Sequence, residues 1–242
     1  MNPTNFFIEL AERGLVPDFF IRAGIRGLCR KRLRQCLSED CEANAELAEK
    51  YLEDSDASPM AVLTDKANEQ HYEVPASFYQ LVLGKNLKYS CCFFEKKNGS
   101  LTDAEDKALD LTCRRARLEN GQNILELGCG WGSLSLRMAK DYPNARITSV
   151  SNSHSQRDFI VGQARERGLE NLKVITEDVN ALETEERFDR VVSVEMFEHV
   201  RNHRELFRRI HSWLNPGGKL FTHVFCHRST SYPFEVEGED DW

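Results

Sequence analysis

The sequence predicts an α/β fold with a doubly wound, mostly parallel sheet, preceded by a helical extension. Three observations support this prediction. From residue 101 onward, short apolar runs alternate with segments whose apolar residues recur at helical spacing, and this alternation is typical of βαβ units. One apolar run breaks into glycines and continues as a helix. The first 55 residues read as short amphipathic helices.

Length and charge exclude several classes of protein. The 242 residues are enough for one large domain with an appendage. A hydrophobic content of 40% with 29% charged residues is ordinary for a soluble globular chain. The formal net charge of -7 argues against a general nucleic-acid binder. The short basic run at 30–35 reads as a solvated helix face.

The eight cysteines predict free thiols. None forms a CxxC pair and no histidine pair completes a zinc spacing, so we expect no metal site. The scattered positions suit a reducing compartment better than a disulfide framework. Because we find no secretory signal and no apolar run long enough to span a membrane, we expect a cytoplasmic protein. The sequence does not predict an oligomeric state.

Three regions separate by pattern. Residues 1–55 are a helical extension, and residues 56–100 are irregular and rich in aromatic side chains, which predicts a lid or substrate segment. Residues 101–242 are the sheet domain. The helices expected in the extension are 5–15, 17–37 and 41–54.

Turn and cap residues separate the elements predicted in the sheet domain. Thr102 followed by Glu105 is the pattern of a capping box for the first helix. Gly168 suits a helix C-cap, and "NPGG" at 215–218 suits a turn. The expected strands are 123–128, 146–151, 172–177, 189–194 and 219–225, and the expected helices are 102–118, 133–142, 155–168 and 203–214.

The segment "ELGCGWG" at 126–132 predicts a ligand site. A strand that turns sharply into a helix leaves backbone N–H groups pointing above the turn, and glycine lets a ligand approach them closely. In an open α/β sheet this turn lies in the crevice at the carboxyl ends of the strands. The alternative is a tight loop that only packs the helix on the sheet. A dinucleotide is disfavoured, because the spacing is G-x-G-x-G and no acidic residue ends the second strand.

Several motifs, in order, resemble one family. The glycine segment looks like the first motif of class I S-adenosylmethionine-dependent methyltransferases, which have a Rossmann-like sheet. With the other motifs, it resembles the cyclopropane fatty acid synthase superfamily, and most closely its coclaurine N-methyltransferase branch. The segments that carry the resemblance are "HYEVPASFYQLVLGKNLKYSCCFF", "ELGCGWGS", "SNSHSQRDFI", "ETEERFDRVVSVEMFEHV" and "FCHRSTSYPFE".

The resemblance implies a site for S-adenosylmethionine. From the residues alone, other roles stay open: Asp178 could cap a turn, Tyr89 could belong to the core, and Gln156 could be an exposed helix residue. The implied contacts are Tyr89 and Ser90 from the lid, Glu126, Gly128 and Gly130 at the methionine portion, Asn152 and Gln156 at the ribose, and Asp178 and Val179 at the adenine.

The acceptor chemistry is predicted from the segment after the fourth strand. An amine at neutral pH needs a base to release its electron pair. If the chain turns helical here, Glu195 and His199 fall at i and i+4 on one face, where a carboxylate raises the basicity of an imidazole. The resemblance implies this pair in amine-methylating members, whereas cyclopropane synthases typically have glycine at the position of Glu195. We therefore expect methylation of a small amine.

Methylene transfer to an unsaturated lipid is the alternative reaction. The resemblance implies that the synthases use a bound bicarbonate as base, held by groups that match Cys91, Glu198 and His223. All three are present, but Phe225 departs from the small aliphatic residue expected near that ion.

Structural roles are further alternatives for these residues. Glu195 could pair with Arg190 or Arg201, while His223 and Cys91 could be core positions. For the chain as a whole, a non-catalytic binding subunit with the same fold is a third reading, and the intact glycine turn argues against it.

The end of the chain carries one more expectation. The family sheet normally has seven strands, the last two forming a hairpin beside the fifth, whereas five are expected here. The resemblance therefore implies that C-terminal strands are missing and that 219–225 is an apolar sheet edge. Such an edge favours association with other chains, so we expect this form to be poorly soluble and weakly active.

Overall fold

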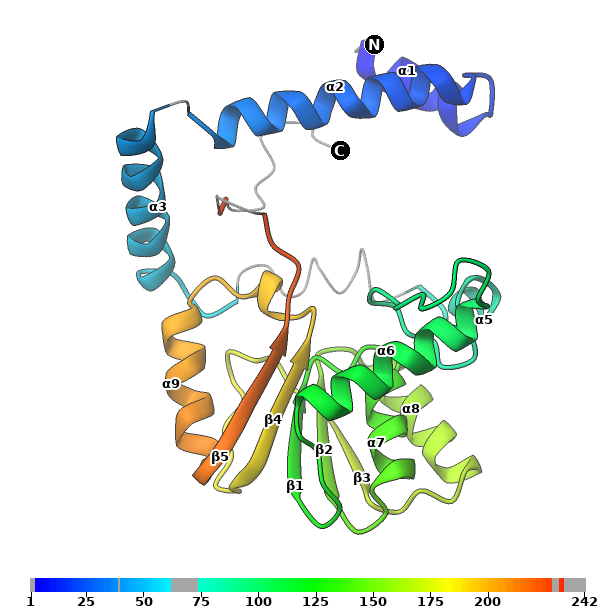
Figure 1. The fold of residues 1–242 in the computed structure, drawn as a ribbon, viewed down its shortest axis with the longest axis vertical. Coiled ribbons are helices and arrows are strands. Elements are labelled where there is room, and N and C mark those ends of the chain that lie inside the picture. Colours follow the sequence, from blue (N-terminus) through cyan, green and yellow to red (C-terminus); the bar gives the residue numbers. More distant parts are fainter. Residues whose placement is uncertain (1–2, 39, 62–73, 228–230, 233–242) are drawn as a thin grey trace. The chain divides into compact units, whose positions relative to one another are not determined.

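The structure is a computed structural model that describes residues 3–38, 40–61, 74–227 and 231–232. The chain divides into two compact units, one formed by 1–54 with 226–242 and the other by 55–225. Figure 1 shows the elements of both. In the described ranges, no helix is long and apolar enough to cross a membrane.

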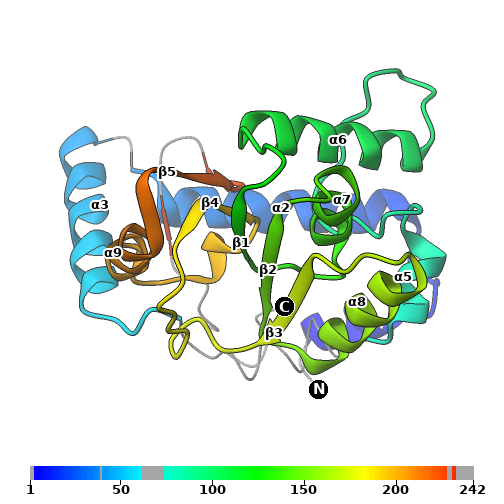
Figure 2. The same cartoon turned by 90° about the horizontal axis from the view of Figure 1, so that it is seen from below.

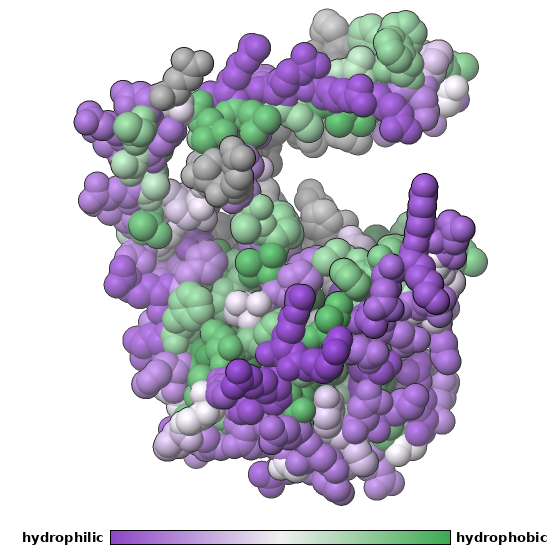
Figure 3. Space-filling view, in the orientation of Figure 1, coloured by the Kyte–Doolittle hydropathy of each residue, from purple (hydrophilic) through white to green (hydrophobic). Residues whose placement is uncertain are grey.

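The smaller unit is helical, as predicted, with α1 (Pro3–Glu12), α2 (Asp18–Cys36) and most of α3 (Cys41–Asp56). Pro17 precedes α2 and Asp18 lies in its first turn, where the helix dipole favours a carboxylate. None of the residues of α2 is buried. Large apolar side chains such as Phe19, Phe20 and Leu28 are exposed instead, and Figure 3 shows apolar and polar patches alternating along this unit.

The larger unit is built on one parallel sheet with the strand order β3-β2-β1-β4-β5. All five predicted strands are confirmed, and so is the doubly wound arrangement. In the described residues, β3 and β5 are the edges of the sheet. The strands are β1 (Asn123–Leu127), β2 (Arg146–Ser151), β3 (Leu172–Thr176), β4 (Phe188–Val194) and β5 (Leu214–His223).

Helices cover both faces of this sheet. Figures 1 and 2 show α6, α7 and α8 against one face and α9 against the other. The predicted helices of the sheet domain are confirmed within two or three residues at each end. The elements are α5 (Ala76–Val82), α6 (Leu101–Arg115), α7 (Ser133–Asp141), α8 (His154–Glu166), the short 3₁₀ helix η2 (Phe197–His199) and α9 (His203–Trp213).

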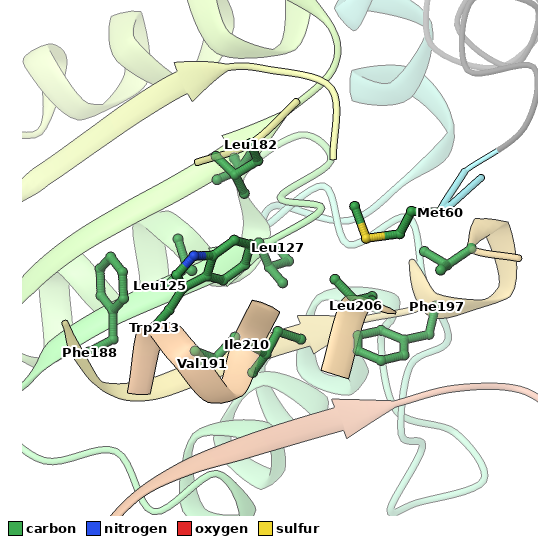
Figure 4. Packing of buried hydrophobic residues seen from close by; sticks show 12 residues of the cluster. Met60, Leu125, Leu127, Leu182, Phe188, Val191, Phe197, Leu206, Ile210 and Trp213 are labelled. Atoms are coloured by element: carbon green, nitrogen blue, oxygen red, sulfur yellow. The ribbon is translucent and has the colours of Figure 1, made fainter. Parts of the chain in front are cut away.

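Alternate residues of the central strands supply two cores, because successive side chains of a strand point to opposite faces. Leu125 packs with the α9 residues Ile210 and Trp213 (Figure 4). Its neighbour Ile124 packs with Leu109 of α6 and other residues on the opposite face. The strands are therefore buried on both faces, which explains their continuous apolar runs.

The start of α6 differs from the prediction. The capping box is formed by Ser100 and Asp103, not by Thr102 and Glu105: Asp103 N–H donates to Ser100 Oγ (3.1 Å), and Ser100 N–H donates to Asp103 Oδ2 (3.3 Å). Both patterns fit the capping-box spacing. The side chain of Glu105 has another function, described below.

The predicted turn at 215–218 is also corrected. Strand β5 already begins at Leu214, which pairs with Phe188. The next pair joins Arg190 to Lys219, so the "NPGG" residues form an irregularity inside the strand span. Gly217 has φ +80, a conformation that favours glycine at such a bulge.

Candidate active site

The order of the strands reverses between β1 and β4. From β1 the chain proceeds to β2 and β3 on one side, whereas β4 and β5 lie on the other. In doubly wound sheets ligands bind at this switch point, outside the carboxyl ends of the strands. Gly128 follows β1 and Glu195 follows β4, so the glycine turn and the predicted catalytic segment meet at the switch point.

The three glycines of the turn all have positive φ, and two of them are required by close packing. Their φ values are +78, +51 and +79 at Gly128, Gly130 and Gly132. A Cβ at Gly132 would lie 2.6 Å from Ile160 Cγ1, and one at Gly128 would lie 2.7 Å from Met196 Cβ. At Gly130 it would meet no atom within 4 Å. The packing role therefore applies to Gly128 and Gly132, whereas a ligand contact at Gly130 stays a prediction.

Glu126 lies at the end of β1 and is only 3% exposed. Its Oε2 accepts hydrogen bonds from Ser149 Oγ (2.7 Å) and from Ser135 Oγ. Burial raises the pKa of this carboxyl group, and the two hydroxyl donors oppose that shift. In this arrangement Glu126 joins β1, β2 and α7 beneath the glycine turn. Its contact with a cofactor stays a prediction.

The loop after β2 is held by buried polar groups. Gln156 is 3% exposed, and its Oε1 accepts a hydrogen bond from Ser151 Oγ (2.8 Å). The reading of Gln156 as an exposed helix residue is therefore wrong. Asn152 is half-buried in the same loop, and Ser153 caps α8 by accepting from Gln156 N–H (3.3 Å).

The loop after β3 contains the two residues predicted at the adenine. Asp178 and Val179 are both half-buried. Asp178 Oδ1 accepts from Asn180 N–H (2.6 Å), and its carbonyl accepts from the N–H groups of Ala181 and Leu182. Asp178 thus caps the local turn, the structural role left open from the sequence. An additional role at a ligand stays a prediction.

A buried carboxylate fixes the lid segment before Tyr89. Glu105 of α6 is fully buried. Its Oε1 accepts from the N–H groups of Gly84 (2.9 Å) and Lys88 (3.2 Å), and its Oε2 from that of Asn86 (2.8 Å). A Cβ at Gly84 would lie 2.6 Å from the Glu105 carboxyl carbon, so glycine is required there. The sequence pattern had suggested a capping box for Glu105 and did not predict this function.

Aromatic packing continues the lid to the glycine turn. Tyr79 contacts Tyr89 edge to face (centroids 5.2 Å apart) and Trp131 of the turn (5.1 Å). Tyr89 is 58% exposed, so it is not a core residue. The next side chain in the lid, Ser90, accepts a hydrogen bond from the ammonium group of Lys88. Burial lowers the pKa of Lys88.

The segment after β4 is not an α-helix at Glu195, and the i, i+4 argument from the sequence is wrong. Glu195 has φ +52, a left-handed conformation that interrupts any regular helix before the short η2 helix at 197–199. Its N–H donates to the His223 carbonyl at 2.7 Å, so β5 fixes this turn. His199 is exposed at the end of η2. The assignment of Glu195 and His199 as a catalytic pair stays a prediction, but the helical spacing no longer supports it.

Glu195 lies instead beside two other predicted residues. Its Oε1 is 3.9 Å from His223 Nε2 and 3.5 Å from the backbone nitrogen of Cys91, and Cys91 Sγ is 3.7 Å from His223 Nε2. Burial raises the pKa of the Cys91 thiol, and the hydrogen bond to Glu195 adds to the shift. Cys91, Glu195 and His223, called here the edge triad, come from the lid, the turn after β4 and the end of β5.

The alternative ion pair between Glu195 and Arg190 is not formed in the described structure. Arg190 Nε donates to the carbonyls of Ala116 (3.1 Å) and Arg117 (3.0 Å), so the guanidinium stabilises the end of α6. Glu198, the third group predicted near a bicarbonate, accepts from Phe225 N–H through Oε1 (2.6 Å). Its Oε2 is buried without a hydrogen-bond partner in the described structure.

Residues 71–73, 228–230 and 233–235 of the family motifs lie outside the described residues. For the others, the structure brings the glycine turn and the edge triad to one end of the sheet, joined by the approach of Gly128 to Met196. The burial of Lys88 was not predicted, because no spacing pattern marks a charged residue as buried.

Several known proteins are similar to this chain over most of its length. A family model described as "Mycolic acid cyclopropane synthetase" matches residues 63–239. The (S)-coclaurine N-methyltransferase of Thalictrum flavum subsp. glaucum is 38% identical over 97% of this chain and 65% of its own length. The chain thus spans just under two thirds of that relative.

Two solved structures are similar as well. A crystal structure of coclaurine N-methyltransferase bound to N-methylheliamine and SAH matches with a TM-score of 0.94 and 35% identity, over 100% of this chain and 70% of that one. The cyclopropane synthase MmaA2 from Mycobacterium tuberculosis matches with a TM-score of 0.62 and 26% identity, over 69% of this chain and 58% of its own.

Proposed function

The chain belongs to the mycolic acid cyclopropane synthetase family, and from this premise we propose that it is an S-adenosylmethionine-dependent methyltransferase that methylates the nitrogen of a small amine. The amine acceptor is favoured over a lipid because the similar coclaurine N-methyltransferase structure covers the whole chain, whereas the cyclopropane synthase covers 69%.

The observation that carries the proposal is the open space at Gly130. Its φ is +51, and no atom lies within 4 Å of the position that a Cβ would take. No neighbour requires glycine there, in contrast to Gly128 and Gly132. A bound ligand that approaches the backbone closely would require it, and the methionine portion of S-adenosylmethionine fits this requirement.

The polar groups of the other loops suit the remainder of such a cofactor. Asn152 and Gln156 would hold its ribose, Asp178 and Val179 its adenine, and Tyr89 with Ser90 would cover it from the lid. Glu126 would support the cofactor site from below the glycine turn, because it holds the hydroxyl groups of Ser135 and Ser149. When bound, the cofactor supplies an electrophilic methyl group on a sulfonium centre.

Residues of the chain would then remove a proton from the amine nitrogen of the acceptor. A small amine is mostly protonated at neutral pH, so its nitrogen becomes a nucleophile only after a base removes a proton. We assign this step to the His199 imidazole, with the Glu195 carboxylate stabilising the imidazolium that forms. Glu195 retains 21% side-chain exposure, which leaves the carboxylate accessible from the crevice.

Methylene transfer to an unsaturated lipid is the second candidate, and one observation favours it. The buried Glu198 Oε2 has no partner in the described structure, and Cys91 and His223 lie close together. Cys91, Glu198 and His223 are the groups expected around a bicarbonate base. Bicarbonate-dependent activity on an unsaturated phospholipid, with none on (S)-coclaurine, would establish this reaction instead.

The test of cofactor binding is Gly130→Val, measured by calorimetry with S-adenosylhomocysteine. A branched side chain would occupy the space above the turn, so we expect binding to be lost while the circular dichroism spectrum is retained. Gly121→Val is the matched control, because Gly121 also has positive φ (+90) and no atom within 4 Å but precedes β1 at the opposite end of the strand. Equal affinity in Gly130→Val and the unmodified chain would refute the site.

A further inference from the structure

The edge triad has the composition of a metal-binding site that the family assignment does not include. The candidate ligand atoms of Cys91, Glu195 and His223 all lie within 4.8 Å of one another. They are a thiol, an imidazole nitrogen and a carboxylate oxygen, which are the three ligand types of zinc in proteins. They come from three separate segments of the chain. The spacing of cysteines and histidines in the sequence, from which we expected no metal site, does not detect such a combination.

The distances between the ligand atoms suit one small cation. With metal–ligand bonds of about 2.0–2.3 Å, tetrahedral coordination places ligand atoms roughly 3.3–3.7 Å apart. Cys91 Sγ and His223 Nε2 are 3.7 Å apart, and His223 Nε2 and Glu195 Oε1 are 3.9 Å apart. The third pair, Cys91 Sγ and the Glu195 carboxylate, lies within 4.8 Å, so closure around an ion needs a movement of up to about 1 Å in side chains that are partly exposed. Three protein ligands would leave a fourth position for water.

The backbone fixes two of the three ligands with respect to each other. His223 is the last residue of β5, and its carbonyl accepts the N–H of Glu195 at 2.7 Å. Cys91 is fixed less directly, through the lid segment that Glu105 holds at 84–88. A site with two rigid ligands and a third on a lid loses little conformational freedom when it closes around an ion.

The surrounding charge sets the expected strength of binding. A cysteine thiolate and the Glu195 carboxylate supply two negative charges for a divalent cation. The buried ammonium group of Lys88 interacts electrostatically with Cys91, Cys92 and Glu195. Its positive charge therefore repels a metal ion bound to the edge triad. The site should therefore bind a thiophilic divalent ion reversibly, more weakly than a structural zinc site.

We propose that Cys91, Glu195 and His223 form a binding site for a thiophilic divalent cation such as Zn²⁺. If the proposed amine methylation is correct, an ion there occupies the Glu195 carboxylate and inhibits the reaction. The inhibition rests on the proposed function, whereas the binding of the ion does not.

The test uses Co²⁺ as a spectroscopic probe for Zn²⁺ on the full chain without cofactor. Tetrahedral Co²⁺ bound to a thiolate gives a sulfur-to-cobalt charge-transfer band, which Zn²⁺ should remove by competition. We expect Cys91→Ser to lose the band and His223→Ala to weaken Co²⁺ binding at least tenfold. Cys92→Ser is the matched control, because the Cys92 thiol contacts the Ser90 carbonyl and lies outside the triad.

The outcomes separate the two proposals. An unchanged band in Cys91→Ser, or an equal loss in Cys92→Ser, would overturn the metal site whatever the cofactor results show. Calorimetry with S-adenosylhomocysteine on the same preparations tests the cofactor site alone. A Cys91-dependent band in a chain that binds no S-adenosylhomocysteine would leave the metal site standing and refute the methyltransferase proposal.

Discussion

The two ends of the strands in this sheet are built differently. At the amino ends, Asp189 accepts hydrogen bonds from Asn123 N–H (2.9 Å) and from Asn215 Nδ2 (2.9 Å), and Arg190 binds the carbonyls at the end of α6. At the carboxyl ends, Glu195 has φ +52, and one carboxylate oxygen of Glu198 is buried without a partner in the described residues.

This contrast separates stability from chemistry. Polar groups that are satisfied locally cannot bind a ligand without first breaking a bond, so the amino ends hold the strands in register. Positive φ, long contacts and unsatisfied oxygens cost free energy in the folded state. Such features concentrate where a ligand can compensate for them, and they gather here at the switch point of the sheet.

The largest effect should come from the carboxyl end. His199→Ala removes the proposed base, so we expect turnover of an amine substrate to fall by about 10²–10⁴-fold. The affinity for S-adenosylhomocysteine and the urea midpoint should stay unchanged, because His199 is exposed. If His223→Ala abolishes turnover and His199→Ala does not, then His223, 3.9 Å from Glu195, is the base.

Glu105→Ala should give the next largest effect, on stability. It leaves the N–H groups of Gly84, Asn86 and Lys88 without their acceptor, and unsatisfied buried donors cost roughly 1–3 kcal/mol each. Since Gly84 and Asn86 are only half-buried, water can replace part of the loss, and we expect about 3 kcal/mol by urea unfolding. Glu119→Ala, at an exposed glutamate, should change little. An equal loss in both variants would contradict the lid function of Glu105.

The smallest effect should come from the amino end and depend on pH. Hydrogen bonds from Asn123 and Asn215 lower the pKa of Asp189, so its stabilising contribution is present above the unfolded pKa of about 3.9 and is lost as pH falls through the lower folded value. Asp189→Ala should therefore cost about 1 kcal/mol at pH 7, and the difference should shrink below about pH 4. Turnover per folded molecule should not change. A difference that grows in acid would refute this assignment.

The sequence predicted the strands well because both faces of each strand are buried, so the apolar runs are continuous. It also located the glycine turn. It could not assign separate functions to Gly128, Gly130 and Gly132, since these depend on Met196 and Ile160, which approach from other segments.

The geometry of the catalytic segment was not predictable either. A helical spacing between Glu195 and His199 looks the same whether or not the backbone turns helical. Here the bond from Glu195 N–H to His223 imposes a left-handed residue, a long-range contact that the local sequence does not contain. The function of Glu105 was missed for the same reason, since its three donors lie 17 to 21 residues away.

The left-handed backbone of Glu195 also bears on how the two chemistries of the family diverged. A φ of +52 is freely available to glycine and costs other residues roughly 1–2 kcal/mol. The resemblance described above gives glycine at this position in cyclopropane synthases. Glutamate and glycine codons differ by a single nucleotide, so one mutation exchanges them, and glycine relieves the strain that glutamate carries at this φ. The exchange that separates the two chemistries would therefore keep the same turn of the backbone.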